Sequence, residues 1–198
     1  MNIDKSTSFK NAIQELLAAH LQDPNMESWN DAVYPAEWLY VQRITERMET
    51  FCPNASEELI IAANCQHLFR WEIERKSFPE GRIGYYQWRN YLSEYQAMKA
   101  REILLKAGFD SDFADQVKTI VKKENIFTNS EAQALEDVVC LVFLEFYLDE
   151  FMNDKSELNM TTIILKTWNK MSEKGHQEAL KIKYSDAALP IIKKALGL

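Results

Sequence analysis

Glycine, proline and cysteine are scarce in this chain. Its 198 residues include five glycines, five prolines and three cysteines. β-Sandwiches and β-barrels need many tight turns, which glycine and proline favour, so their scarcity argues against both classes. The cysteines, Cys52, Cys65 and Cys140, have no CxxC spacing, and the last two lie in apolar helical runs. This pattern indicates buried thiols and predicts a reducing, cytoplasmic setting.

An excess of positive charge is also absent, because the formal net charge is -7 at pH 7. A nucleic-acid surface must neutralise phosphates with lysine and arginine, so we expect no nucleic-acid partner. The longest apolar run covers only residues 138–144, which is far too short to cross a bilayer, so we expect no membrane partner. The first residues lack a basic stretch followed by an apolar run, so we expect no signal peptide.

The residues that are abundant predict a helical protein. Hydrophobic residues make up 46% of the chain and charged residues 27%, which is typical of a globular domain with a sizeable core. We predict one compact all-α domain over residues 1–198, with about eight or nine helices. The sequence does not indicate an oligomeric state.

Apolar spacing and capping residues place the first four helices. The segment from Ser8 to about Leu21 carries apolar residues at helical spacing. Pro35 marks the start of a second helix, and Ser56 is a suitable N-cap for a third. A long fourth helix is expected from Tyr85 to about Ala107, ended by Gly108.

Two further segments complete the expected organisation. The helix expected from Ser130 to about Met152 is apolar nearly all round, which is typical of a central helix. The segment between the first two helices is predicted as a loop, because Asp23-Pro24-Asn25 stops the helical pattern.

The segment 61–90 differs from the rest of the chain. Its cations outnumber its three glutamates, although the whole chain is acidic, and it contains Trp71, Trp88 and a loop with Pro79 and two glycines. A cationic, aromatic segment between helices is a poor core and a plausible binding site. We predict that its cations bind a small anionic ligand: Arg70, Arg75, Lys76, Arg82 and Arg89.

Four of the expected helices each carry a polar residue on an otherwise apolar face. They are Glu37, His67, Gln96 and Asp137, with Gln66 beside His67 and Glu136 beside Asp137. A buried carboxylate is costly unless a cation or hydrogen-bond donors satisfy it. Histidine and carboxylates from several helices suit a divalent transition metal. We predict that Glu37, His67 and Asp137 bind such a metal and that Gln66, Gln96 and Glu136 line its pocket.

Each of these residues also has a structural interpretation. Glu37 could only complement a helix dipole, and His67 could be a hydrogen-bonded core histidine. Gln96 could be an amide at the edge of the core, and Asp137 could pair with an arginine such as Arg70 or Arg89. The functional interpretation depends on all four lying next to the cationic segment.

Long stretches of the chain resemble the domain-of-unknown-function family numbered 4202. The stretches are DPN at 23–25, YPAEWLY at 34–40, AANCQHLFRWEIERKSFPEGRIGYYQWR at 62–89, ALEDVVCLVFLEFY at 134–147 and KTWNKMSEKGH at 166–176. The resemblance covers nearly the whole chain, and the family name implies no particular activity.

More remotely, the order of helices is similar to that of the HD-domain metal-dependent phosphohydrolases, which are helical enzymes. Those use a histidine on one helix, a His-Asp pair on the next and a later aspartate. By this resemblance Glu37 stands where the first histidine belongs, Gln66-His67 where the pair belongs, and Asp137 where the last aspartate belongs. Of these, Asp137 is the position that keeps the residue of that superfamily.

Three functions are therefore expected from the sequence. The first is an altered HD-like hydrolase, in which a metal activates water against a small phosphorylated molecule held by the cations. The alternative is a non-catalytic module that binds a small anion or a protein partner through the same cations. The third is a structural or interaction protein, in which the histidine and the aspartate pair with arginines.

Overall fold

Helices dominate the structure, as the scarcity of glycine and proline predicts. The structure is a computed structural model that describes residues 6–153 and 157–198. Ten α-helices and one small two-stranded sheet lie in these ranges, so the all-α prediction is confirmed. A search of the same ranges for a helix with the length and apolar character of a membrane span finds none.

The chain divides into two compact units, Met1–Asn125 and Ile126–Leu198, and each is described by itself. That the chain forms one domain over residues 1–198 stays a prediction.

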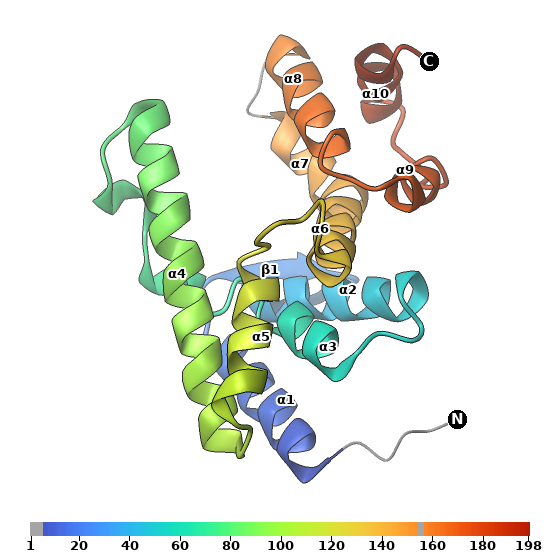
Figure 1. The fold of residues 1–198 in the computed structure, drawn as a ribbon. Helices are drawn as coiled ribbons and strands as arrows, with labels where there is room; N and C mark the ends of the chain where they lie inside the picture. The colour runs from blue at the N-terminus through green and yellow to red at the C-terminus, as the bar shows by residue number, and fades with distance from the viewer. Residues whose placement is uncertain (1–5, 154–156) are drawn as a thin grey trace. The chain divides into compact units, whose positions relative to one another are not determined.

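The first unit contains five α-helices and the sheet (Figure 1). They are α1 (Thr7–His20), β1 (Met26–Trp29), β2 (Ala32–Pro35), α2 (Ala36–Phe51), α3 (Glu57–Asn64), α4 (Gly81–Ala107) and α5 (Ser111–Val121), with the 3-10 turns η1 (Arg70–Glu72) and η2 (Arg75–Ser77) before α4. Helix α3 packs against α1, α2 and α5, and α4 packs against α1 and α5. Apolar side chains of α1, α2 and α3, such as Leu16, Ile44 and Ile61, are fully buried.

The predicted capping residues work as expected in this unit. The Ser56 side chain accepts a hydrogen bond from the Leu59 N–H at 3.0 Å and caps α3. Gly108 ends α4 with a left-handed φ of 98°, a conformation that glycine adopts without steric cost.

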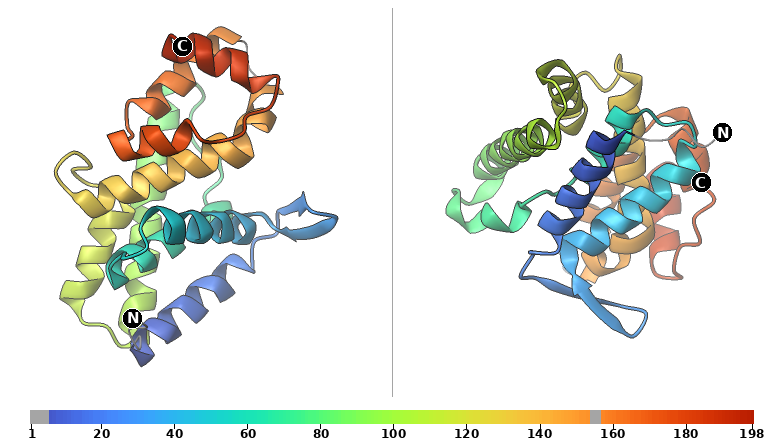
Figure 2. Two further views of the ribbon diagram at one scale, coloured as in Figure 1. Left: turned by 90° about the vertical axis from the view of Figure 1, so that its right-hand side faces the viewer. Right: turned by 90° about the horizontal axis from the view of Figure 1, so that it is seen from below.

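The segment predicted as a loop after α1 forms a β-hairpin instead, and this is a correction. Strands β1 and β2 pair antiparallel with Trp29 opposite Ala32, and Figure 2 shows the hairpin leading into the start of α2. Asn30 and Asp31 form the tight turn with φ of 50° and 62°, values that these residues tolerate and that a two-residue hairpin turn requires. Arg43 of α2 anchors the hairpin through a 2.7 Å ion pair with Glu27.

The ends of two helices also differ from the prediction. Helix α3 stops at Asn64, so His67 lies in the turn beyond it and not on a helix face as predicted, and α4 begins at Gly81 rather than Tyr85. A side chain at Gly84 would place its Cβ 1.8 Å from the Pro79 carbonyl oxygen. Because glycine has no Cβ, the loop at Pro79 can lie against the first turn of α4. The helix can therefore begin at Gly81, close to this loop.

The second unit contains the other five α-helices. They are α6 (Ser130–Val142), α7 (Leu148–Asn153), α8 (Glu157–Trp168), α9 (Glu173–Ala179) and α10 (Ala188–Leu196). A π-helical turn, η3 (Phe143–Tyr147), joins α6 to α7, so the long helix predicted from Ser130 to about Met152 is present with one widened turn. Helix α9 packs against α6, and α10 packs against α7 and α8.

The start of α9 is held by a side chain of α6. The carboxylate of Asp137 accepts hydrogen bonds from the Ser172 backbone N–H at 2.7 Å and from the Ser172 hydroxyl at 2.6 Å. The Ser172 oxygen in turn accepts the Gly175 N–H at 3.2 Å and caps the helix. Asp137 thus satisfies its charge with hydrogen-bond donors at a helix N-terminus, where negative charge is favourable.

We predict that Gly175→Ala destabilises the protein. Alanine in a helix is ordinarily more stable than glycine by about 1 kcal/mol. Here, however, the new Cβ would lie 2.6 Å from Asp137 Oδ1, and such a clash costs about 1–3 kcal/mol. Urea denaturation followed by circular dichroism measures the change. Gln177→Ala, at an exposed position of the same helix, is the control and should change stability little. A Gly175→Ala protein as stable as the wild type would contradict the clash.

Candidate functional site

Three of the predicted site residues meet in the first unit. His67 Nδ1 lies 2.8 Å from Glu37 Oε2, and His67 Nε2 lies 3.0 Å from Arg70 Nη1. Arg70 Nε also lies 3.6 Å from Glu37 Oε1. Glu37 comes from the first turn of α2, His67 follows α3, and Arg70 opens η1. We call these residues the Glu37–His67–Arg70 cluster.

The hydrogen bonds of the cluster assign its protonation state. A guanidinium can only donate, so His67 Nε2 accepts from Arg70, and Nδ1 carries the proton that is donated to Glu37. Burial lowers the pKa of His67 to about 4, against the opposing effect of Glu37. Burial alone would raise the pKa of Glu37, but His67 and Arg70 hold it below its usual value. At neutral pH the cluster is a neutral imidazole between a carboxylate and a guanidinium.

The backbone around His67 is unusual. His67 and Phe69 have left-handed φ values of 61° and 52°, which cost about 1–3 kcal/mol each for residues other than glycine. The ring of Tyr40 stacks on the imidazole at 4.0 Å between centroids and fixes its orientation. Strain of this kind gathers at functional sites, and here it orients His67 toward Glu37.

A groove of about 480 Å³ opens beside the cluster. Its walls come from the segment after α1, the start of α2, the turns η1 and η2, and α4. The lining residues are Pro24, Asn25, Glu37, Arg70, Trp71, Ile73, Glu74, Arg75, Lys76 and Trp88. We refer to this site as the groove.

The charges of the groove are not all balanced within it. Arg70 lies against Glu37, and Lys76 pairs with Glu74 at 2.8 Å. Arg75 donates instead to the backbone carbonyls of Phe78 at 3.1 Å and Gly81 at 3.3 Å. Within the described ranges Arg75 has no carboxylate partner, so its charge is left for a ligand.

Trp88 connects the loop of the groove to α4. Its indole N–H donates to the Ile73 carbonyl at 2.8 Å, and the Arg70 guanidinium lies over its ring at 5.3 Å from the centroid. The tryptophan therefore holds both the backbone of the loop and one of its cations.

Arg82 and Arg89 are placed differently from the other predicted cations. Both are exposed on α4, and neither lines the groove. The Arg82 guanidinium lies over the ring of Tyr86 at 5.6 Å. The structure thus places Arg70, Arg75 and Lys76 together at the groove and leaves Arg82 and Arg89 on the helix surface.

Gln66 and Gln96 are both buried, but they do not line the groove. Gln66 donates its side-chain amide to the Ala62 carbonyl at 3.2 Å. The Gln96 side-chain nitrogen is buried and has no hydrogen-bond partner in the part of the chain that the structure describes. Neither residue joins the Glu37–His67–Arg70 cluster.

Glu136 and Asp137 belong to the second unit. Glu136 lies 3.2 Å from Lys170 Nζ, and Asp137 accepts its hydrogen bonds from Ser172 and Gln133 of the same unit. The predicted metal ligands are therefore divided between two units, and their convergence stays a prediction.

Metal chemistry places a condition on the cluster. Both imidazole nitrogens of His67 are hydrogen-bonded, and the charge of Arg70 lies beside the ring. In this arrangement Glu37 and His67 do not fit a metal cation, because a ligand nitrogen must have its lone pair available. Among residues 6–153 and 157–198, no group of three or more His, Cys, Asp or Glu side chains is placed to hold a metal ion.

Two residues of the site were missed from the sequence. Asp23 accepts the Glu37 backbone N–H at 2.9 Å and so caps α2, whose own N-cap residue, Pro35, makes no side-chain hydrogen bond. His20 is fully buried, and its Nε2 lies 2.9 Å from the Asn64 carbonyl oxygen. Burial lowers the pKa of His20, and the nearby Glu37 and Asp23 oppose this effect. In the sequence the DPN stretch at 23–25 gave no sign that Asp23 caps α2, and no motif pointed to His20.

Comparison with known proteins agrees with the family resemblance that covers nearly the whole sequence. The model of the family described as Domain of unknown function (DUF4202) matches residues 10–192. The chain belongs to the DUF4202 family. Neither the curated proteins nor the solved structures contain a significant match to it. The remote link to the HD-domain phosphohydrolases is not shown by these comparisons and stays a prediction.

We predict that His67 stays neutral across the physiological pH range. Its folded-state pKa of about 4 lies below the usual 6.5, so the unfolded chain takes up the proton first. The stability that this group contributes is therefore full above about pH 6.5 and is lost as the pH falls toward 4. NMR titration of the imidazole, assigned with His67→Gln, measures the pKa directly. A midpoint near 6.5 would contradict the cluster.

Proposed function

We propose that this DUF4202 protein binds a small anionic molecule in the groove. The observation that carries the proposal is that the charge of Arg75 has no carboxylate partner in the described residues. Arg70 and Lys76, which line the same groove, do have carboxylate partners. Phosphate and carboxylate groups are the ligands that a guanidinium binds best.

Arg75 retains the capacity to bind such a group. A guanidinium has five N–H donors, and the hydrogen bonds to the Phe78 and Gly81 carbonyls come from Nη1 and Nη2. These bonds orient the side chain, so a ligand does not have to order it. A preoriented cation loses less conformational entropy on binding, which raises affinity.

The aromatic walls favour a ligand with an apolar part as well. Trp71 and Trp88 line the groove together with Ile73. Binding sites for small molecules commonly combine apolar walls with a few placed charges. We therefore infer that the ligand carries its anionic group on a small organic body.

Metal-dependent hydrolysis, implied by the HD-domain resemblance, is a second proposal, in which Glu37 and His67 would be the metal ligands of the first unit. It requires Arg70 to leave His67 Nε2, for example to bind the incoming phosphate, because this nitrogen has no available lone pair while Arg70 donates to it. Atomic emission analysis of protein purified without added metal tests this proposal. A stoichiometric metal that is lost in both His67→Ala and Glu37→Gln is expected, and metal-free protein that hydrolyses no phosphate ester would contradict it.

We predict that Arg75→Gln weakens anion binding by about tenfold or more. A hydrogen bond to a charged group contributes about 1.5–3 kcal/mol, and each 1.4 kcal/mol is tenfold in affinity. Isothermal titration with phenyl phosphate and pyrophosphate at constant ionic strength measures the change. Lys166→Ala, which removes an exposed cation of α8, is the matched control and should bind as the wild type does.

The same titration separates the groove from the surface of α4. Arg82→Ala and Arg89→Ala should change affinity by less than about threefold, because screened charges at exposed positions contribute little. If these two variants lose binding and Arg75→Gln does not, the anion binds on α4 and the groove proposal is wrong.

A further inference from the structure

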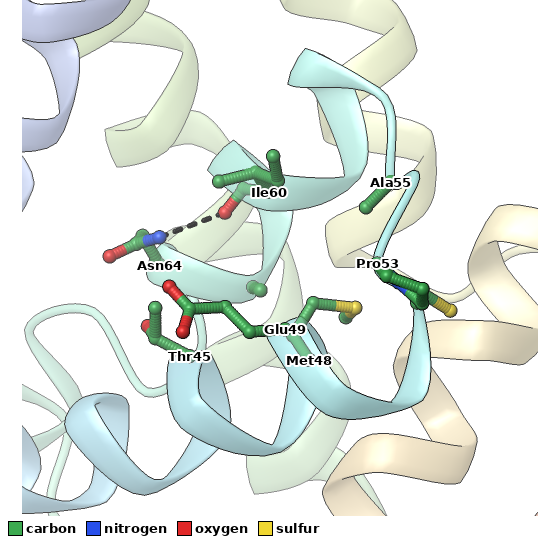
Figure 3. A pocket seen from close by; sticks show the side chains of 9 residues that line it. Thr45, Met48, Glu49, Pro53, Ala55, Ile60 and Asn64 are labelled. Carbon is green, nitrogen blue, oxygen red and sulfur yellow. Dashed lines mark hydrogen bonds between the residues drawn. The ribbon is translucent and has the colours of Figure 1, made fainter. Parts of the chain in front are cut away.

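A second hollow lies in the first unit between α2 and α3 (Figure 3). Its volume is about 240 Å³, and none of its lining residues lines the groove. The lining residues are Thr45, Met48, Glu49, Cys52, Pro53, Ala55, Ile60, Ala63 and Asn64. We refer to it as the interhelix pocket.

The spacing of residues on α2 creates one wall of this pocket. Met48 and Glu49 lie three and four residues after Thr45, and Cys52 lies three residues after Glu49, so these residues share one face of the helix and its C-terminal end. Pro53 stops the helix, and α3 supplies the facing wall. The small side chains of Ala55 and Ala63 leave the space between the walls unfilled.

One end of the pocket is polar. The hydroxyl of Thr45 donates to the Val41 carbonyl at 2.9 Å, so its oxygen is left as an acceptor. The side-chain amide nitrogen of Asn64 donates to the Ile60 carbonyl at 2.9 Å, which leaves the amide oxygen as an acceptor. Figure 3 shows Thr45, Glu49 and Asn64 on the same side of the pocket.

The carboxylate of Glu49 adds a charge to this end. Within the part of the chain that the structure describes, Glu49 forms no ion pair. The other end of the pocket is apolar and sulfur-rich, with Met48, Cys52, Pro53 and Ala55. Figure 3 shows Pro53 and Ala55 away from the polar group. The pocket therefore has a negative, acceptor-lined end and an apolar end.

We infer that the interhelix pocket binds a small organic cation, a primary ammonium group joined to a short alkyl chain. An ammonium has three N–H donors and no acceptor, which matches the oxygens of Thr45, Glu49 and Asn64. The alkyl chain would then lie against Met48, Pro53 and Ile60, and thioether side chains adapt to such chains. The inference does not depend on anion binding in the groove.

Three probes with the same alkyl chain test this inference by isothermal titration: hexylammonium, hexanol and hexanoate. We expect hexylammonium to bind about two- to fivefold more tightly than hexanol, because Glu49 is exposed and solvent screens part of its attraction for the ammonium. Hexanoate should bind more weakly than hexanol, because Glu49 repels its carboxylate.

Variants locate the binding site. Glu49→Gln should reduce the affinity for hexylammonium to that for hexanol, and Glu46→Gln, at an exposed position of the same helix that does not line the pocket, should leave it unchanged. Ala55→Leu should weaken both probes because it fills the apolar end. Protection of Cys52 from iodoacetamide by hexylammonium gives an independent readout, since the other two cysteines are buried.

Two sets of results would overturn the inference. One is that hexylammonium binds no more tightly than hexanol, or does not bind at all, to a wild-type protein that is folded by circular dichroism. The other is that Glu49→Gln keeps the preference for the cation, or that Glu46→Gln loses it equally. Loss of phosphate binding in the groove would leave these measurements unaffected, so the two sites are tested separately.

Discussion

The groove depends on one constraint, which is that the negative charge of Glu37 must be balanced by hydrogen-bond donors and a cation. This side chain is only 16% exposed, and a carboxylate removed from water needs a cation or donors around it. His67 supplies one N–H and Arg70 a positive charge. Arg70 then lies over Trp88, which holds the loop through the Ile73 carbonyl. A single half-buried carboxylate thereby connects α2, the segment after α3, the turn η1 and α4.

The half-buried Glu37 and the buried Asp137 are satisfied in different ways in the two units. Glu37 uses a neutral imidazole and a guanidinium, whereas Asp137 uses the backbone and hydroxyl donors of Ser172 at the start of α9. A pairing with a cation can be exchanged for a pairing with a ligand, because both carboxylate and ligand compete for the same guanidinium. A helix cap offers no such exchange, so Asp137 stays bound to the start of α9, whereas an anionic ligand would compete with Glu37 for Arg70.

The sequence predicted much of the fold, and it singled out Glu37, His67 and Arg70, which the structure brings together. Caps and helix ends such as Ser56 and Gly108 were correct because they depend on the conformation of a few neighbouring residues. The hairpin after α1 was missed because its turn, Asn30-Asp31, lacks the usual glycine. The cations Arg70, Arg75 and Lys76 were identified by local composition alone, which could not separate them from Arg82 and Arg89.

The amino-acid sequence by itself determined the all-α class, the helix caps and the supply of charged and aromatic residues in the segment 61–90. Each of these depends on neighbours within about one turn, where side-chain spacing and backbone propensity decide. Only the tertiary structure decided which charge meets which. It brought Glu37 to His67 across thirty positions of the chain, and it left Arg75 facing backbone carbonyls. The reason is that a partner distant in sequence is chosen by packing and by the turn of the backbone at His67, which no local pattern encodes.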